Sequence, residues 1–199
     1  MLATASAAFR LFAWVDESVL VGSAGDSGTY TMAAVLADPT HCGELRSELQ
    51  ALMIKPGVRL HWVSESPKRR DLIAEAVGRM DIAAILTVGT PMDRSRQERA
   101  RRCCLERLLY ELDQAGVSEV RLESRAAAQD KRDVHLVNTA RRKRLISHDL
   151  QVTFARPSLE PMLWLPDAVA GAMSAAMLGE DRWLTAIAEM VTVHQVAIR

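Results

Sequence analysis

The chain has 199 residues, and its 25 Lys and Arg balance its 25 Asp and Glu, so the formal net charge is zero. This balance excludes a uniformly basic coat for nucleic acid. Apolar residues make up 49% of the chain and charged residues 25%, which is the composition of an ordinary globular protein with a core of its own. The charge is unevenly distributed, because residues 94–144 hold 14 basic and 8 acidic side chains.

The three cysteines have neither CxxC nor Cys/His spacing, which is typical of reduced thiols. No basic segment precedes an apolar run at the start, so we expect no signal peptide. The most apolar stretch, 161–179, contains Pro166 and Asp167, and a carboxylate in lipid costs several kcal/mol. The sequence therefore predicts a cytoplasmic protein without a membrane association, folded as a single domain over residues 1–199.

The first part of the chain predicts an antiparallel strand pair followed by helices. A strand that is apolar on both alternating faces ends at Asp16, and a Gly, Ser and Asp-rich loop over 22–28 leads to the next strand. Ser66 and Pro67 are typical of a helix start. The predicted elements are strands over 9–15 and 29–37, a helix over 42–53, a short strand over 59–63, a helix over 67–79 and a strand over 82–88.

The second part alternates helices and strands. A leucine stripe predicts a helix over 94–115, with Ser95 and Glu98 as a capping box and Gly116 as its stop. An apolar helical region over 162–178 is interrupted by Pro166. The remaining predicted elements are a strand over 117–123, a basic helix over 129–144, a strand over 150–155 and a helix over 181–189, with an ambiguous tail from residue 190.

Strands first and then alternating helices and strands predict an α/β protein with a mixed sheet. A dinucleotide-binding fold would carry GxGxxG after its first strand, and the chain has Asp16, Glu17 and Ser18 there. The GxxxxGK[ST] phosphate loop is also missing from the sequence. These features argue against nucleotide binding through a phosphate loop.

Three carboxylates stand where such a scaffold can bring them together. Asp16 ends the first strand, Glu123 ends a later strand, and Asp167 lies in an apolar helical stretch. Strand ends at one edge of an α/β sheet converge. Carboxylates held close together need a compensating cation, and oxygen ligands select Mg²⁺ or Mn²⁺. Such a site suits phosphodiester hydrolysis.

Each of these carboxylates also has a purely structural interpretation. Asp16 fits a turn opener, because Asp hydrogen-bonds to nearby backbone. Glu123 shares an alternating face with Glu119 and Arg121, which is typical of a solvated edge strand. Asp167 fits a helix N-cap after a proline, although its apolar neighbours favour a functional role, since a buried carboxylate without a partner is costly.

Four sequence blocks carry a family resemblance: DES at 16–18, LESR at 122–125 followed by Asp130 and Asp133, EPMLWLPDAVAG at 160–171, and QERARR at 97–102. In order and spacing they resemble the bacterial domain of unknown function 3800 family. The resemblance implies an RNase H-like fold in which Asp16, Glu123 and Asp167 bind a divalent metal, with Asp130 as a further candidate ligand. It implies a metal-dependent nuclease, a hydrolase that acts on RNA or DNA.

Basic side chains form two clusters that suit a polyphosphate partner, because arginine forks bind phosphate oxygens. Solvated helix faces are the alternative interpretation. Glu17 is a candidate to complete a second metal site or orient water, and Arg125 a candidate to steady a phosphate. The predicted nucleic-acid-binding residues are Arg99, Arg101, Arg102, Arg125, Arg141, Arg142 and Lys143.

Two other functions stay open from the sequence. One is a non-catalytic module that binds nucleic acid or an acidic protein on the same scaffold. The other is an enzyme active only in a complex or as a homo-oligomer, for which Met173, Met177 and Met190 could supply a contact. The histidines lack HExxH spacing, so zinc is not expected. His61 is the one histidine that could approach the carboxylates from a short strand.

Overall fold

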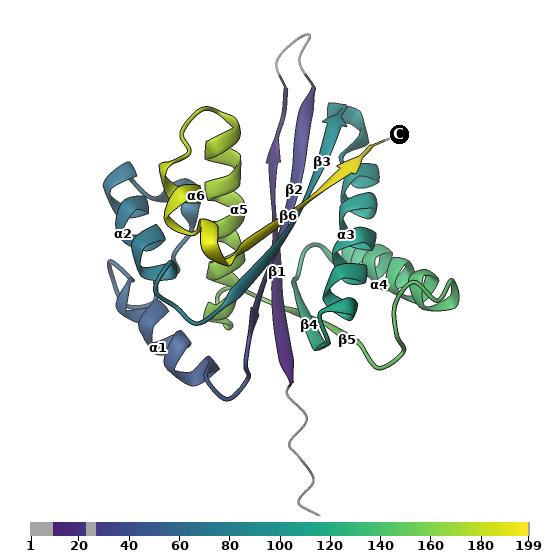
Figure 1. The fold of residues 1–199 in the computed structure, drawn as a ribbon, viewed down its shortest axis with the longest axis horizontal. Helices are drawn as coiled ribbons and strands as arrows, with labels where there is room; N and C mark the ends of the chain where they lie inside the picture. The colour runs from purple at the N-terminus through teal and green to yellow at the C-terminus, as the bar shows by residue number, and fades with distance from the viewer. Residues whose placement is uncertain (1–9, 23–26, 199) are drawn as a thin grey trace, which may run out of the picture.

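The computed structural model describes residues 10–22 and 27–198 and is built on a six-stranded sheet in the order β5-β4-β1-β2-β3-β6 (Figure 1). Phe9 and residues 23–26, which belong to the first predicted strand and the loop after it, lie outside the described residues. The strands are β1 (Leu11–Leu20), β2 (Gly28–Ala37), β3 (Ala83–Met92), β4 (Val117–Glu123), β5 (Gln151–Ala155) and β6 (Val191–Ala197).

The strand directions define the architecture. β1, β2 and β3 pair antiparallel in sequence order, and β4 then adds parallel to β1 and β5 parallel to β4. This order, three antiparallel strands followed by parallel strands on the β1 side, is that of an RNase H-like mixed sheet, with β6 added parallel to β3 at the other edge. The predicted fold class is therefore confirmed.

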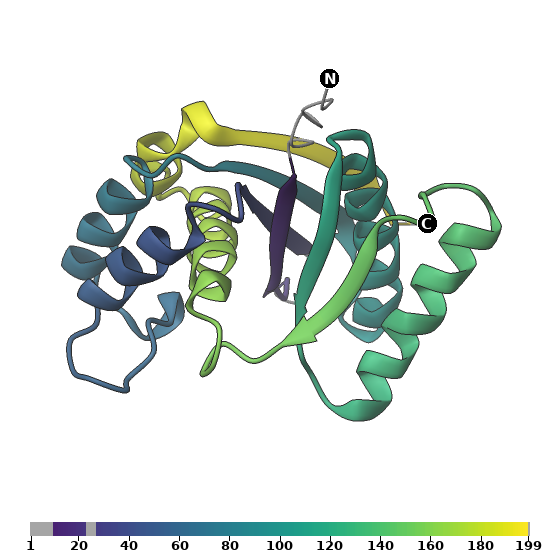
Figure 2. The ribbon, with the colours of Figure 1, turned by 90° about the horizontal axis from the view of Figure 1, so that it is seen from below.

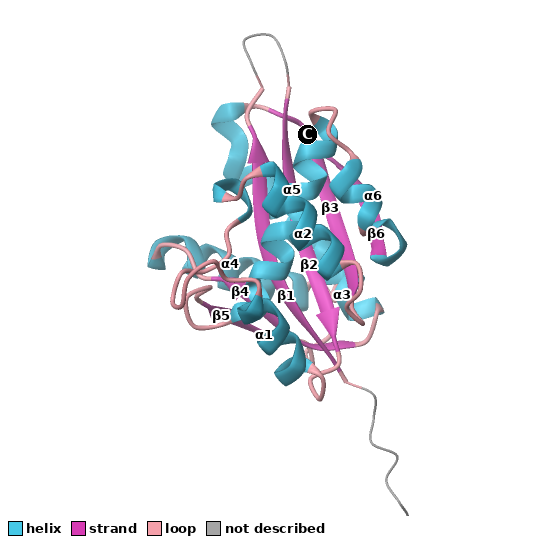
Figure 3. Ribbon diagram, turned by 90° about the vertical axis from the view of Figure 1, so that its left-hand side faces the viewer, coloured by secondary structure: helices cyan, strands magenta, loops and turns pink. Residues whose placement is uncertain are grey.

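Helices cover both faces of the sheet (Figures 1 and 2). Figure 3 looks onto one face of the sheet with its helices in front, and the remaining helices lie over the other face. On the first face are α1 (Cys42–Ala51), α2 (Pro67–Val77), α5 (Trp164–Met177) and α6 (Arg182–Ala186), and on the second are α3 (Gln97–Gln114) and α4 (Ala127–Arg142). Short 3₁₀ helices are η1 (Trp62–Ser64), η2 (Arg94–Arg96), η3 (Pro161–Leu163) and η4 (Ala188–Met190).

The double coverage explains why β1 is apolar on both alternating faces. Trp14 belongs to the core on the α5 side, whereas Ala13 and Val15 belong to the core on the α3 side. Because successive side chains of a strand point to opposite faces, Asp16 follows Trp14 toward α5 and Glu17 follows Val15 toward α3. The strand thus sends two neighbouring carboxylates to different environments.

Several local predictions are wrong for identifiable reasons. The predicted strand over 59–63 is an extended His61 followed by η1, because its side chains pack on α5 and not in a ladder. Pro166 does not interrupt the helix, since it lies in the first turn of α5, where backbone N–H groups have no partner in the helix. Asp167 also lies in this first turn and is therefore not the N-cap of α5; the N-cap residue is Leu163.

The start of the third helix and the end of the chain also differ from the prediction. The side chain of Asp93 accepts from the Ser95 N–H at 2.7 Å and begins η2, so α3 starts only at Gln97 and has no Ser95 capping box. The ambiguous tail forms β6. Among the described residues, no helix combines the length and the apolar character that a membrane crossing requires.

Candidate functional site

The sheet places two of the predicted carboxylates side by side. β1 and β4 are parallel neighbours, and their register pairs Val15 with Leu122, so Asp16 and Glu123 follow at the same level. The guanidinium of Arg121 lies 5.7 Å from the Trp14 ring centre on the α5 side, and Glu123, two residues later, points to this same side. α5 carries the third carboxylate, Asp167, in its first turn.

The electrostatics show that the three carboxylates interact. Burial raises the pKa of Asp16 well above its usual range, and the neighbouring charges of Glu123, Asp167 and Glu17 raise it further. Burial also raises the pKa of Glu123, although a hydrogen bond with the Asp16 carboxyl and the charge of Arg59 oppose this rise. β1, β4 and α5 therefore assemble a half-buried cluster of three carboxylates whose negative charges raise the pKa of Asp16.

A segment between α1 and α2 forms one wall of this cluster. The backbone N–H of Trp62 donates to Asp167 Oδ2 at 2.8 Å, and His61 Nδ1 lies 3.3 Å from the same oxygen. Arg59 Nη1 lies 3.9 Å from Glu123 Oε1. The backbone N–H of Glu17 donates to Asp16 Oδ1 at 2.7 Å, so each carboxylate has at least one donor or cation beside it.

Tight packing holds this wall in place. The Trp62 ring lies against Gly171 of α5, where an added Cβ would meet the ring at 2.1 Å. Trp183 also contacts the Trp62 ring, edge-on at 5.4 Å between centroids, and Arg70 Nε donates to the Trp62 carbonyl at 3.1 Å. His61 is the histidine expected near the carboxylates, whereas Arg59 is a site residue that the sequence signals only by its position two residues before His61.

The donor chemistry fits a divalent cation, because carboxylate oxygens are the ligands that Mg²⁺ and Mn²⁺ prefer. The positions of the described side chains do not form a complete ligand set. Across residues 10–22 and 27–198, no three His, Cys, Asp or Glu side chains are arranged as a group that could hold a metal ion. The structure thus shows a carboxylate cluster and not an assembled metal centre.

Glu17 and Arg101 belong to a separate buried network on the α3 face. Arg101 is only 2% exposed, forms an ion pair with Glu17, and donates from Nη2 to Asp133 Oδ2 at 2.8 Å. Arg125 Nη2 lies 3.2 Å from the same Asp133 oxygen. Arg101 is therefore not a surface contact for nucleic acid, and Glu17 faces away from the cluster; both expectations are corrected by the alternation of β1 and the burial of α3.

The side chains of Asp130 and Arg125, two further candidates, are both engaged in contacts with neighbouring residues of the protein. Asp130 accepts from Ser124 Oγ and from the Arg125 N–H, both at 2.8 Å, and so closes the turn between β4 and α4. The structure does not bring it into the cluster. The Arg125 side chain is 15% exposed and also pairs with Glu98 at 3.1 Å, which leaves little of it for a phosphate.

The other predicted basic residues divide into two groups. Arg141 is half-buried and donates from Nη2 to the Leu150 carbonyl at 2.7 Å, so it holds the start of β5. The exposed residues are Arg99, Arg102, Arg142 and Lys143. These four keep surface that a partner could contact.

Fold and site together define an RNase H-like α/β protein with half-buried carboxylates on two central parallel strands: Asp16 lies in the middle of β1, which continues to Leu20 and does not end at Asp16 as predicted, and Glu123 lies at the end of β4. No protein-family model and no curated protein matches the sequence. Among solved structures, the chain is similar to a chain of the PCNA:RNase HII complex from Archaeoglobus fulgidus, with 14% identity, a TM-score of 0.48 and coverage of 90% of this chain and 77% of that one.

Proposed function

We propose that the chain is a Mg²⁺- or Mn²⁺-dependent nuclease that hydrolyses phosphodiester bonds of RNA or DNA, with Asp16, Glu123 and Asp167 as the metal ligands, and that it belongs to the domain of unknown function 3800 family. The observation that carries the proposal is the position of half-buried Asp16 beside Glu123 on the neighbouring strand, where the charges of Glu123 and Asp167 raise its pKa. Such an arrangement destabilises a fold, and perturbed carboxylates of this kind concentrate at functional sites.

Each residue of the site then has a role. Asp16, Glu123 and Asp167 would hold the ion, which when bound supplies a Lewis acid that activates water and offsets charge on the phosphodiester. The Trp62 N–H fixes the orientation of Asp167 through its hydrogen bond. Arg59, which is 40% exposed at the rim beside Glu123, presents a guanidinium to an incoming phosphate.

The test compares Asp16→Asn with the wild type on labelled single-stranded, double-stranded and hybrid substrates, with Mg²⁺, Mn²⁺ or EDTA. Because loss of a group behind a metal ligand already costs 10–100-fold, loss of a ligand should lower cleavage at least about a hundredfold. Asp149→Asn, an exposed carboxylate before β5, is the matched control and should cleave like the wild type. Equal cleavage by wild type and Asp16→Asn would remove the proposal.

The second candidate is a non-catalytic nucleic-acid-binding module, and the lack of an assembled metal group among the described residues favours it. Calorimetric titration with Mn²⁺ separates the two. A nuclease of the proposed kind takes up Mn²⁺ and loses that binding in Asp16→Asn. No heat at millimolar Mn²⁺, together with salt-sensitive binding of RNA or DNA, would support the module.

A further inference from the structure

A groove of about 880 Å³ lies between α3 and α4, on the sheet face opposite the carboxylate cluster. Both helices contribute to its walls. Among its lining residues are three on α3, Arg99, Arg102 and Glu106, and three on the α4 side, Lys131, His135 and Lys143. Nothing in the proposed chemistry uses this groove.

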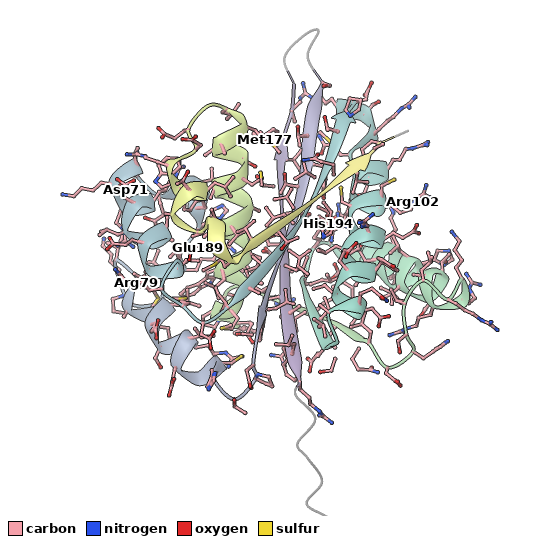
Figure 4. All side chains as sticks on the ribbon, viewed as in Figure 1. Asp71, Arg79, Arg102, Met177, Glu189 and His194 are labelled. Atoms are coloured by element: carbon pink, nitrogen blue, oxygen red, sulfur yellow. The ribbon has the colours of Figure 1, made fainter. Side chains whose placement is uncertain are left out.

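The rims of the groove carry positive charge that the fold does not neutralise. Arg99, Arg102, Lys131 and Lys143 are all exposed, and none forms an ion pair or side-chain hydrogen bond with another described residue. Figure 4 shows Arg102 on the outer side of α3, away from the sheet. Glu106 is the one acidic residue of the lining without such a partner among the described residues.

The floor of the groove is rigid. Arg101 of α3 and Asp133 of α4 meet there with the 2.8 Å contact described above, and their side chains are 2% and 6% exposed. Separating a buried pair of this kind would leave two uncompensated charges, so the pair holds the two helices together at this point. The groove is therefore a built feature of the fold and not a gap between loose helices.

The spacing of the cations indicates an extended ligand. Lys131, in the second turn of α4, and Lys143, its C-cap, are twelve residues apart, which at 1.5 Å per residue is about 18 Å. A single phosphate group cannot span this distance, whereas a strand with a charge at every nucleotide can. The lining contains no Phe, Tyr or Trp, and His135 is its one ring on which a base could stack, so recognition mainly through the backbone is favoured.

We propose that the α3–α4 groove binds the sugar–phosphate backbone of a nucleic acid strand, as a second site separate from the carboxylate cluster. This second site rests on the proposed function, because the groove would give that enzyme a sequence-independent binding site for its substrate. It does not require catalysis, and binding and cleavage can therefore be measured separately.

The experiment measures fluorescence anisotropy of a labelled 20-nucleotide single strand, in EDTA, in an Asp16→Asn background so that nothing is cut. The added double change Arg102→Glu with Lys131→Glu should weaken binding at least tenfold and flatten the salt dependence, by about 0.7 in log–log slope per lost contact. The control Lys55→Glu with Arg79→Glu makes the same charge change on exposed residues of the other helical layer, and should weaken binding less than threefold.

Two results would overturn the inference. One is an equal loss in both double variants, which would mean that only net charge matters. The other is displacement of the strand by tripolyphosphate at equal phosphate concentration, which would assign the groove to small phosphate compounds. If the groove variants bind the strand like their control while the wild type still cleaves with metal, only this inference is wrong. If the groove binds the strand but the wild type does not cleave, only the proposed nuclease activity is wrong.

Discussion

At the scale of single residues, Asp16 and Glu17 show how position in a strand decides what a carboxylate does. Glu17 meets the buried cation Arg101, and its charge is compensated. Asp16, one residue earlier, faces other carboxylates, and burial is the largest cause of its raised pKa. The uncompensated member of the pair is therefore the one with a functional explanation.

Asp16→Asn should stabilise the metal-free fold at neutral pH. The pKa of Asp16 is higher in the folded than in the unfolded chain, so its contribution to stability falls as pH rises from the unfolded value toward the folded one. Asn removes this penalty, and we expect a gain of about 0.5–2 kcal/mol at pH 7. Urea unfolding in EDTA measures it.

The pH dependence of stability distinguishes the removal of the Asp16 charge from a stabilising effect of the Asn side chain that does not depend on charge. Below about pH 4 the acid is mostly protonated in both states, and most of the gain should disappear. Asp149→Asn, on the surface, should change the free energy of unfolding by less than about 0.5 kcal/mol at either pH. A gain in Asp16→Asn that is the same at pH 3.5 and pH 7 would contradict the assigned cause.

At the scale of elements, the contact between α5 and η1 connects the core to the carboxylate wall. Gly171 lets the Trp62 ring lie directly on the helix, and the Trp62 N–H in turn holds Asp167. A helix interior normally disfavours glycine by about 1 kcal/mol relative to alanine. The contact outweighs that cost, because no larger residue leaves room for the ring.

Gly171→Ala should therefore destabilise the protein by about 1–3 kcal/mol despite the better helix propensity of alanine. Thermal unfolding gives the size, and tryptophan emission should shift to the red as Trp62 is displaced. Gly43→Ala in α1, where an added Cβ meets nothing within 4 Å, is the control and should be neutral or stabilising by up to about 1 kcal/mol. Equal stability of both variants would show that the ring adapts without cost.

At the scale of the whole molecule, one sheet separates two apolar cores. The core on the α5 side contains all four tryptophans, Trp14, Trp62, Trp164 and Trp183, and the core on the α3 side contains none. Both cores include side chains of β1, β2 and β3, so the unfolding of either helical layer would expose apolar side chains of the sheet to water. This arrangement predicts that the layers unfold together.

Tryptophan fluorescence and far-ultraviolet circular dichroism should give the same midpoint in urea. Fluorescence follows only the α5 side, whereas circular dichroism also follows α3 and α4 on the opposite face. Coincident curves are the signature of one cooperative unit and would support the prediction of a single domain. Two midpoints, with fluorescence and dichroism separated, would mean that the layers are independent.

Much of the fold could be predicted because its signals are local. Apolar runs and the Gly116 stop located β4, α3 and the central strands, and the strand ending at Glu123 has the predicted bounds. The strand predicted over 59–63 is wrong because the alternation of its apolar residues is the same as that of a strand. The packing of Trp62 on Gly171, more than a hundred residues away in the chain, keeps this segment outside the sheet.

The sequence by itself determined the mixed α/β class and singled out Asp16, Glu123 and Asp167 as candidate carboxylates, since periodicity and charge are properties of neighbouring residues; it did not show that β1 continues past Asp16 to Leu20. The tertiary structure alone decided which charges meet. It buried Arg101 between Glu17 and Asp133, confined Asp130 to a turn and brought Arg59 to Glu123. Electrostatic and packing energies depend on distances between residues remote in the chain, and those distances exist only once the sheet has formed.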